Sequence, residues 1–526
     1  MLTVRVLFLT LVLPLVSSLN VLIFNPLLGR SHVNYMVRLA DILQEAGHNV
    51  TVIESVIDPL DKVKGNQPFE TIVVPQADNV RENVEGRDQS ISEFVWKTKT
   101  IWTMRAAFSH LTNVQAQQCN ETLSSSAMWN RIKGRKFDVA LSESFDLCGF
   151  ALFDQIGIRN TALVLSQMTT EGSGILTGLP AFPSYVPGFM PSTGEKMTFI
   201  QRVFNTFGTL MKPLMFHFMS GPLNAVLDEK YGTERTSLRD LFLRASLVFV
   251  NRDPLVDFPA PTLHKIIDIG GVSVSSGPKP LNKTWSDIFD LRPKTVLLSF
   301  GTVARSYLMP ENFKKNIRET FRKFPDVTFI WKYEKPEHRM SEGIPNIVES
   351  TFVPQNDMLY DPRLSLFITH CGAGSSVEAT LAGVPLIIIP VMGDQKRNSL
   401  VILRHGGGAT LDREDLGNPG KLEEAIQELL GNPRYAEKSR QLAATLRDKP
   451  FTPKEIFLKN VEFLGKYGPL RQLEHYGQQL NVFQYYLIDV FAFVIFILIL
   501  VLPSIFLVFR CTFRFVRNRV SKSKVE

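Results

Sequence analysis

A histidine, a glycine-rich turn, a glutamate and an Asp-Gln pair follow one another in the second half of the chain. The apolar run Leu364–Thr369 leads into His370, and a helix is predicted to begin near Ser375. A glycine turn between a strand and a helix lets a phosphate approach backbone N–H groups at the positive end of the helix. Glu378, one turn into that helix, and Asp394-Gln395, after the next apolar run, face the same crevice. These groups suit the hydroxyls of a sugar nucleotide.

A second histidine occupies a similar place in the first half. The apolar run Val21–Phe24 is followed by the turn Gly29-Arg30-Ser31-His32, and Val33–Ala46 has helical spacing of apolar residues. Ligands of parallel α/β sheets gather at the carboxyl ends of the strands. An imidazole titrates near neutrality, so it can accept a hydroxyl proton. His32 is therefore the candidate base, although a single histidine in such a turn more often caps a helix or is buried.

The elements that position these residues alternate between strands and helices. With 526 residues the chain is too long for one ordinary core, which indicates two domains. Alternating strands and helices imply parallel, doubly wound sheets. In the first half we expect strands at 21–24, 50–53, 71–74, 137–141, 161–165 and 247–250, with loops and mobile helices over 172–222. In the second half we expect them at 295–300, 327–331, 347–352, 364–369 and 386–389.

Hydrophobic segments mark the two ends of the chain. Residues 1–18, with the apolar run Leu2–Val16 and small residues after it, are typical of a signal peptide. Val490–Phe509 is uncharged and long enough, at about 30 Å, to cross a bilayer as a helix. Basic residues follow it, and basic flanks stay cytosolic. The sequence predicts a single-pass type I membrane protein whose bulk is lumenal.

Most of the net charge comes from the predicted cytosolic tail. Residues 510–526 carry six basic side chains and one acid, which is +5 of the formal +7. The pI near 9.1 is therefore no argument for nucleic-acid binding. The last five residues, 522–526, resemble a lysine-based retrieval signal for the endoplasmic reticulum, or are ordinary basic flanking charge. Cys511 lies where palmitoylation occurs.

Cysteine and asparagine positions fit a lumenal protein. Four cysteines do not make a disulfide framework, and the sequence leaves open whether Cys119 and Cys148 pair. Asn120 and Asn282 begin Asn-x-Thr sequences and are predicted N-glycosylation sites. Asn49 also begins such a sequence, but it opens an apolar strand and is expected to be buried.

The segment Phe352–Gln395 resembles the signature of the UDP-glycosyltransferase family, which includes the glucuronosyltransferases. The matching positions are Phe352, Pro354, Gln355, His370, Gly372, Ser375, Glu378, Asp394 and Gln395. The resemblance extends over nearly all of 20–510 and implies the GT-B fold, in which two Rossmann-like domains face a cleft. It implies an acceptor-binding domain over 19–272, a linker over 273–293, a UDP-sugar-binding domain over 294–455, helices returning to the first domain over 456–485, a transmembrane helix over 486–509 and the cytosolic tail.

The resemblance also implies roles for the donor-half residues. Phe352, where the family usually has Trp, would stack on uracil, and Gln355 would bind uracil or ribose. Glu378 would hold the ribose hydroxyls, and Asp394 with Gln395 those of the hexose. Phosphate and nucleotide contacts would come from Ser299, Gly301, Thr302, His370, Gly372, Gly374 and Ser375.

The family pairs its catalytic histidine with an aspartate just after a Phe-Asp-Val strand. Here that strand begins Phe137-Asp138-Val139, and the aspartate position is taken by Glu143. Glu143 would orient His32 and stabilise its imidazolium form. Asp146 and Asp138 are the alternatives.

The implied reaction is an inverting transfer of a hexose from a UDP-sugar to a hydroxyl, giving a β-glycoside. No Asp-x-Asp motif or His/Cys ligand cluster is present in the sequence, so we expect no cofactor or metal, with backbone dipoles and His370 replacing a cation. Ala260 stands where glucuronate-using relatives carry Arg, which favours UDP-glucose over UDP-glucuronate. The Phe- and Met-rich region 182–219 favours a lipophilic acceptor, or packs between domains or against a membrane.

Other functions stay open on the sequence alone. A dedicated lipid or steroid transferase fits as well as a detoxifying enzyme, and a non-catalytic nucleotide-sugar-binding membrane protein fits less well because the acid and base residues are present. The acceptor and the oligomeric state are not readable from the sequence.

Overall fold

The computed structural model describes residues 18–61, 67–84, 95–97, 101–167, 174–188, 194–274, 279–418 and 420–522. The chain divides at Leu473 into a large first unit and a small C-terminal unit, which begins at Glu474. Apart from Ser18, the predicted signal peptide lies outside the described residues, as do the last four residues of the tail.

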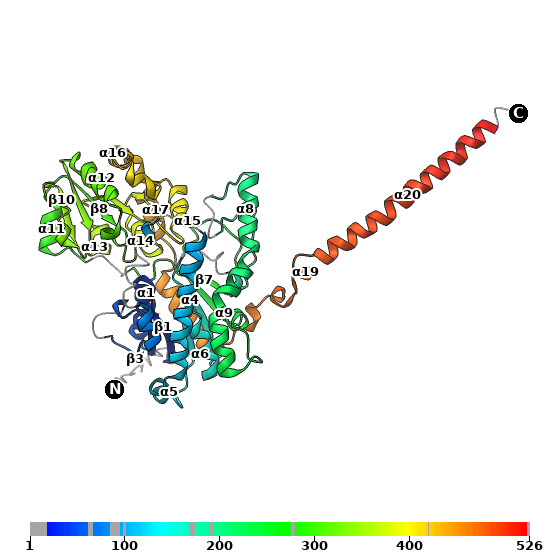
Figure 1. The fold of residues 1–526 in the computed structure, drawn as a ribbon, viewed down its shortest axis with the longest axis horizontal. Coiled ribbons are helices and arrows are strands. Elements are labelled where there is room, and N and C mark those ends of the chain that lie inside the picture. Colours follow the sequence, from blue (N-terminus) through cyan, green and yellow to red (C-terminus); the bar gives the residue numbers. More distant parts are fainter. Residues whose placement is uncertain are drawn as a thin grey trace, which may run out of the picture. The chain divides into compact units, whose positions relative to one another are not determined.

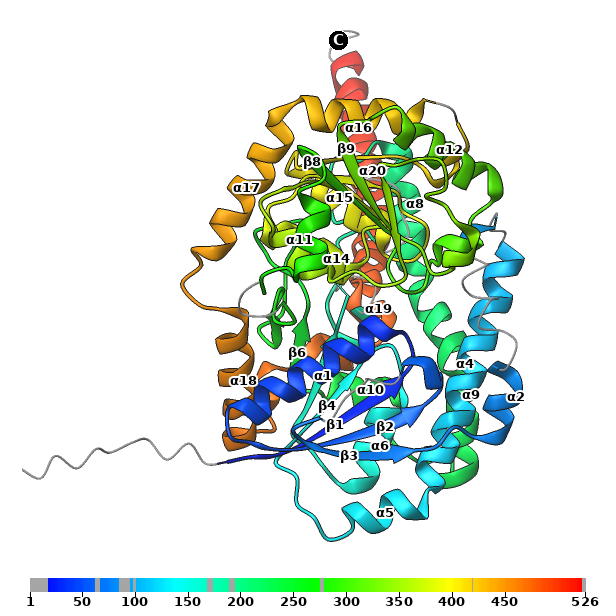
Figure 2. The ribbon, with the colours of Figure 1, turned by 90° about the vertical axis from the view of Figure 1, so that its left-hand side faces the viewer.

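The first half of the large unit is built on a parallel sheet that has seven strands within the described residues (Figure 2). The strand order is β3-β2-β1-β4-β5-β6-β7, so the order in which strands are added to the sheet reverses between β1 and β4, where a cleft for ligands is expected. The strands are β1 (Asn20–Leu27), β2 (Asn49–Val56), β3 (Glu70–Val74), β4 (Val139–Glu143), β5 (Thr161–Leu165), β6 (Leu247–Val250) and β7 (Ile266–Asp268).

Helices cover this sheet and supply the rest of its core. They are α1 (Arg30–Glu45), α2 (Asp78–Val84), α4 (Ile101–Ser124), α5 (Ser126–Ile132), α6 (Cys148–Ile156), α7 (Gly174–Thr177), α8 (Phe199–Leu210), α9 (Lys212–Tyr231) and α10 (Leu238–Leu243). A disulfide joins Cys119 of α4 to Cys148 of α6, which answers the pairing that the sequence left open.

The second half repeats the design with a parallel sheet in the order β10-β9-β8-β11-β12-β13. Its strands are β8 (Lys294–Ser299), β9 (Val327–Lys332), β10 (Ile347–Ser350), β11 (Leu364–Thr369), β12 (Leu386–Ile388) and β13 (Gly408–Thr410). Its helices are α11 (Lys283–Phe289), α12 (Glu311–Arg322), α13 (Gln355–Tyr360), α14 (Ala373–Ala382), α15 (Gln395–Arg404), α16 (Lys421–Gly431) and α17 (Pro433–Arg447). Short 3-10 turns lie at 59–61, 306–308, 336–338, 413–417, 471–473 and 476–479.

Helix α18 (Pro453–Tyr467) packs on the first sheet, although it follows the second half in sequence. Its Phe457, Val461 and Leu464 are fully buried in one cluster with residues of β1, β4 and β6. The ring of Phe457 meets that of Phe249 edge-on at 4.9 Å. The chain therefore passes back to the first half before it reaches Leu473.

A buried ion pair joins the two halves of the large unit. Arg397 Nη1 of α15 lies 2.9 Å from Asp257 Oδ1, and both side chains are almost wholly buried. His405 Nε2 also lies 2.7 Å from the carbonyl oxygen of Val256. Trp96 makes a further contact between the halves, donating from Nε1 to the carbonyl of Arg305 at 2.9 Å. The two halves are thus joined by polar contacts from separate segments of the chain.

The C-terminal unit contains α19 (Val482–Tyr485) and the long helix α20 (Ile488–Lys522), which Figure 1 shows at the end of the chain. Within the described residues, Ile488–Arg519 is the segment long and apolar enough to cross a membrane. The predicted apolar C-terminal helix is confirmed, and the helix continues through most of the basic tail. The length and composition of α20 indicate a membrane anchor.

Candidate active site

A glycine with unusual backbone geometry places His32. Strand β1 ends at Leu27, and Gly29 precedes α1 with φ of 77°, a conformation that glycine adopts without strain. Gly29 N–H donates to Asp61 Oδ2 at 2.6 Å, which fixes the turn. The helix begins at Arg30, three residues before the predicted start, so His32 lies in the first turn of α1 and not before it.

The imidazole of His32 is held on one side by a serine and a glutamate. Ser166 Oγ lies 2.8 Å from His32 Nδ1 and donates to Glu143 Oε1 at 2.9 Å. Glu143 Oε1 itself lies 3.3 Å from His32 Nδ1. The serine hydroxyl therefore bridges the carboxylate and the ring, and Nε2 is the nitrogen left for a substrate.

Glu143 is fixed by its own backbone contacts. Its side chain is 1% exposed, and its Oε2 accepts from Phe145 N–H at 2.6 Å. The ring of Phe145 stacks on His32 with centroids 4.5 Å apart. Burial alone would lower the pKa of His32, but the Glu143 charge and hydrogen bond outweigh it and raise that pKa above its ordinary value.

The two alternative carboxylates lie elsewhere. Asp146 is buried at the start of α6, where its Oδ1 accepts from Cys148 N–H at 2.7 Å and burial raises its pKa to about 7. Asp138 precedes β4 at the opposite end of that strand, where it accepts from Asn20 N–H at 2.7 Å. Of the three candidates, the structure brings Glu143 to His32.

Ser166 was not predicted from the sequence. It is the first residue after β5, and β5 pairs with β4 in parallel register. A polar residue directly after an apolar strand was the available signal, since carboxyl ends of parallel strands share one edge of the sheet. The strand order, which sequence does not give, is what places it beside Glu143.

In the second half, His370 fits between two glycines. A Cβ atom built on Gly301 would lie 2.7 Å from His370 Cε1, and one built on Gly372 would lie 2.7 Å from Nε2. Burial, followed by the charge of Lys332, lowers the pKa of His370 to about 4. The ring is therefore neutral near pH 7. A neutral ring acts on a phosphate as a hydrogen-bond donor, and the expectation that His370 takes the place of a cation stays a prediction.

Lys332, which the sequence analysis did not name, brings a positive charge to this turn. It ends β9, its side chain is 13% exposed, and its Nζ contacts the carbonyl oxygen of Gly301. Burial lowers the pKa of Lys332 below its ordinary value, and the opposing charge of Glu334, 3.8 Å away, offsets only part of that effect. Ser299 and Thr302 flank Gly301 in the same turn, and Ser299 Oγ accepts from Gly301 N–H at 3.4 Å.

Gln355, Ser375 and Glu378 form one network between α13 and α14. Gln355 Nε2 donates to Ser375 Oγ at 3.1 Å and to Glu378 Oε2 at 2.7 Å. Burial raises the pKa of Glu378 against the effect of the Gln355 hydrogen bond. Gly374 lies beside Ser375 with open space around its Cα, so a ligand can approach the backbone there. The structure brings these four predicted residues together.

Phe352 differs from them in being 71% exposed. An exposed aromatic ring before α13 offers a face on which a base can stack.

Replacing Phe352 by alanine is expected to weaken UDP binding about tenfold, because base–aromatic stacking contributes roughly 1–3 kcal/mol. Titration calorimetry with UDP measures this change. Phe451→Ala, which removes a ring that is 65% exposed outside the site, is the matched control. Equal UDP affinity in the Phe352 variant and the wild type would remove Phe352 from the uracil site.

Asp394 and Gln395 stand at the start of α15. Asp394 Oδ2 accepts from Asn398 Nδ2 at 2.8 Å, and burial raises its pKa while the charge of His32 opposes the rise. The charges of Asp394 and His32 act on each other's pKa, so the strand-end residues of the two halves interact electrostatically. Gln395 Oε1 accepts from the backbone N–H groups of Val391 and Met392, so its amide holds the loop before α15.

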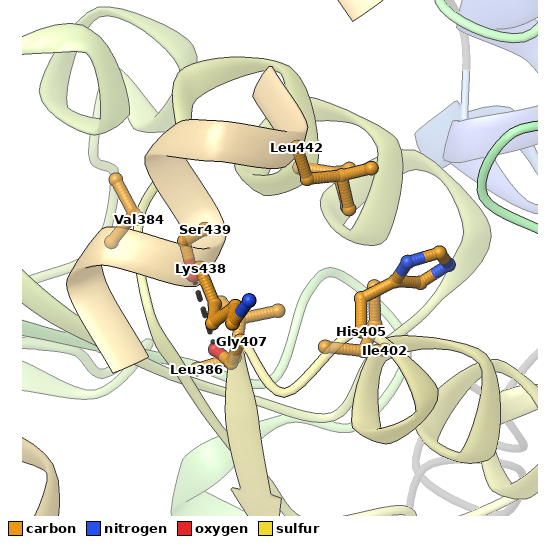
Figure 3. Close-up of a pocket in the computed structure, with 9 residues that line it drawn as sticks. Val384, Leu386, Ile402, His405, Gly407, Lys438, Ser439 and Leu442 are labelled. Carbon is orange, nitrogen blue, oxygen red and sulfur yellow. Dashed lines mark hydrogen bonds between the residues drawn. The ribbon is translucent and has the colours of Figure 1, made fainter. Parts of the chain in front are cut away.

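A small hollow elsewhere in the second half is too small for a sugar nucleotide (Figure 3). Its volume is about 20 Å³, and it lies among residues such as Val384, Ile402 and Leu442. Ser439 Oγ donates to the Gly407 carbonyl on its wall. Such a volume admits a single water molecule at most. Within the described ranges, no group of three or more His, Cys, Asp or Glu side chains is arranged to hold a metal ion.

The predicted glycosylation sites differ in their surroundings. Asn120 and Asn282 are both exposed, in α4 and before α11 respectively, and they stay predictions. Asn49, expected to be buried, is exposed, because it is the first residue of β2 and its side chain reaches out to Asn20. Thr51, the threonine of the same Asn-x-Thr sequence, is fully buried.

The large unit contains two parallel α/β sheets. At the strand ends of the first lies His32 with its serine and glutamate partners, and at those of the second lies the glycine turn around His370. This arrangement is that of a GT-B glycosyltransferase. Solved structures with this fold include Phytolacca americana UGT2 complexed with UDP-2fluoro-glucose and pterostilbene (TM-score 0.58, 14% identity, 86% of this chain and 100% of that one). Another is the glycosyltransferase VinC in complex with DTDP (TM-score 0.57, 15% identity, 85% and 100%). The GT-B prediction is confirmed.

Residues 21–525 match the family model of UDP-glucoronosyl and UDP-glucosyl transferases, and this chain belongs to that family. Similar proteins include putative UDP-glucuronosyltransferase ugt-47 of Caenorhabditis briggsae, 30% identical over 93% of this chain and 92% of that protein. UDP-glucuronosyltransferase 3A1 of Xenopus laevis is 26% identical over 89% and 88%. The protein is a UDP-glycosyltransferase, an enzyme that transfers a hexose.

Proposed function

We propose that this enzyme transfers glucose from UDP-glucose to a hydroxyl of a small lipophilic acceptor, with inversion at the anomeric carbon. The observation that carries the proposal is the His32 constellation, in which Ser166 and Glu143 engage Nδ1 and leave Nε2 for the acceptor. The raised pKa of His32 supports it, because the imidazolium form is stabilised when the base takes up a proton.

In this mechanism His32 Nε2 removes the acceptor's hydroxyl proton as the oxygen attacks the anomeric carbon. The bond from that carbon to the UDP oxygen breaks, and its electron pair leaves with UDP. Attack from the face opposite UDP turns an α-linked donor into a β-glycoside. Glu143 stabilises the positive ring through Ser166, as the acid of a catalytic dyad does.

The leaving UDP needs charge stabilisation, which we assign to the 299–302 turn and its neighbours. A neutral His370 can donate a hydrogen bond, and Lys332 supplies positive charge beside Gly301. Backbone N–H groups at the start of α14 add the helix-terminus field. In this proposal no metal ion takes part in the transfer. The donor's hexose hydroxyls are held by Asp394 and Gln395.

UDP-glucose is preferred because Ala260 offers no charged partner for a uronate carboxylate. UDP-glucuronate is the alternative donor. We further propose that the catalytic unit lies in the lumen of the endoplasmic reticulum, with α20 as a single type I span and the basic residues after it cytosolic.

The test measures UDP release by microsomes that contain the full chain, with UDP-glucose or UDP-glucuronate and a panel of phenols and sterols. Turnover with UDP-glucose supports the proposal. Turnover with UDP-glucuronate alone would overturn the donor assignment but keep the reaction. UDP binding without turnover on any acceptor would contradict the transfer to small lipophilic acceptors.

Ser166→Ala is expected to lower kcat about two- to tenfold, the effect of losing one neutral hydrogen bond. Glu143 then reaches the ring only across the 3.3 Å contact. Ser166→Thr, which keeps a hydroxyl, should retain most of the rate. If both variants lost the same activity while KM for the donor rose, the serine would act in packing and not as a bridge.

A further inference from the structure

Helix α8 has its polar side buried and its apolar side exposed. Within α8, all of which lies in a described range, Asn205 is the buried side chain. Its Nδ2 donates to the carbonyls of Pro183 and Val186 at 2.8 Å each, and its Oδ1 accepts from Gly188 N–H at 3.0 Å. A surface helix of a soluble protein has the opposite arrangement, with its apolar stripe toward the core. The exposed face of α8 therefore needs another explanation than packing.

Helices α8 and α9 follow one another along one side of the first unit (Figure 1). The exposed apolar side chains of α8 and of the first turns of α9 recur every three to four residues, which places them on one face. We call this the α8–α9 face; its residues, with their exposed fractions, are Phe199 (69%), Ile200 (58%), Val203 (48%), Phe204 (70%), Phe207 (62%), Leu210 (60%), Leu214 (45%), Met215 (40%) and Phe218 (64%). The four phenylalanines alone expose roughly 500 Å². Contiguous apolar patches of that size mark docking surfaces.

The face is open, and its charge is of one sign. A hollow of about 440 Å³ along it is lined only by α8 side chains, from Phe199 to Leu210. A site on one helix does not enclose a small acceptor. Between Phe199 and Met219 the chain has Arg202, Lys212 and His217 but no Asp or Glu. Apolar side chains with basic neighbours are the composition of helices that lie in the membrane–water interface.

The chain also limits what can cover this face. The first unit ends at Leu473 and α20 begins at Ile488, and the residues between them span at most roughly 50 Å. If α20 crosses a membrane, as proposed above, the catalytic unit is held next to that bilayer at high effective concentration. A bilayer is then the apolar partner that is always within reach.

We propose that the α8–α9 face docks on the lipid bilayer and inserts its phenylalanines among the headgroups and upper acyl chains. The catalytic unit then rests on the membrane, and acceptors dissolved in the bilayer reach it without crossing bulk water. This inference rests on the proposed membrane anchor and not on the identity of the donor.

The test uses the full chain in vesicles of phosphatidylcholine with some phosphatidylserine. Cys511→Ser removes the exposed free thiol, since Cys371 is buried. Single cysteines are then placed by Phe204→Cys, Phe451→Cys and Val494→Cys and labelled with an environment-sensitive dye. Phe451 is the matched control because it is 65% exposed and aromatic. Quenching by lipids with a nitroxide on the acyl chain is measured at each position.

The probe at position 204 is expected to be quenched about threefold or more over the probe at 451. The probe at 494, within α20, reports the anchor separately. Quenching at 494 but equal, weak quenching at 204 and 451 would overturn the docking while keeping the anchor. No quenching at 494 would overturn the anchor itself. A probe at 204 shielded only at high protein density, without lipid quenching, would assign the face to a second copy of the chain and overturn the proposal.

An independent variant checks that the effect comes from the face. Phe204→Glu combined with Phe207→Glu alters exposed side chains and leaves the Asn205 contacts in place. In this double variant the single labelled cysteine is placed by Ile200→Cys. Lipid quenching of the probe at 200 is expected to fall to the level of the probe at 451. Unchanged quenching in this variant would contradict insertion of the face.

Discussion

Replacing His32 by alanine is expected to lower kcat/KM for glycosyl transfer by about 10²- to 10⁴-fold, the usual effect of removing a general base. The reason is geometric. Ser166 and Glu143 hold Nδ1 and leave Nε2 for the acceptor, and the charge of Asp394, from the second half, raises the pKa of the ring.

Initial rates of UDP release with saturating donor measure the effect. UDP affinity should be unchanged, because the proposed nucleotide site lies in the other half. His264→Ala, at an exposed position outside the site, should keep full activity. Wild-type rates in the His32 variant would move the base elsewhere and contradict the proposed mechanism.

Glu143→Gln is expected to lower the plateau of kcat by about 10²-fold or more, because the imidazolium loses its stabilising carboxylate. It should also move the acid limb of the pH–rate profile to lower pH. Burial lowers the pKa of His32, and the Glu143 charge raises it above the ordinary value. Without that charge the burial effect is opposed only by the more distant Asp394 and Asp61, so the pKa falls. The active form is the neutral ring, which then persists to lower pH.

The shift in the limb separates a charge effect from simple misfolding, which would lower the rate at every pH without moving the limb. Asp146→Asn tests the alternative partner of His32, because Asp146 is a buried carboxyl near the same strand end. It should leave the limb in place. A shift with Asp146→Asn and none with Glu143→Gln would assign the partner of His32 to Asp146.

Much of the fold follows from local sequence patterns. Strands β5, β6 and β11 have the predicted bounds, because apolar runs buried on both faces of a parallel sheet are unambiguous over four to six residues. Strands β7 and β13 were missed. Each is three residues long at an edge of its sheet, and β13 contains a glycine. Runs this short carry too little pattern to be separated from loops.

Helices were harder to place where glycine and proline dominate. The region 172–222 was expected to hold loops and mobile helices, and α8 and α9 are regular helices over its second half, from Phe199 onward. The signal for α8 was present as a capping box, with Thr198 and Gln201 bonding each other's backbone N–H groups. Proline at the second position of α9 is likewise a helix-start signal.

The site shows which chemical properties a sequence carries and which require the structure. Residue identity and the family resemblance were enough to name His32, the donor-turn residues and Glu143 among three candidate carboxylates, and the fold places His32, Glu143 and the donor turns at the strand ends of the two sheets. Ser166 and Lys332 needed the strand order, since each reaches the site from a neighbouring strand. The neutral state of His370 needed its burial between Gly301 and Gly372, which no spacing reveals.

The anomeric configuration of the product tests the central claim most directly. The product made from UDP-glucose and a simple phenol by the full chain would be isolated and its anomeric proton coupling measured by NMR. The proposed base in the first half and the proposed UDP site in the second predict a β-glucoside, formed in equal amount to the released UDP and at a rate about 10²- to 10⁴-fold lower with His32→Ala. An α-glucoside would mean retention, which would contradict direct attack by an acceptor that His32 deprotonates.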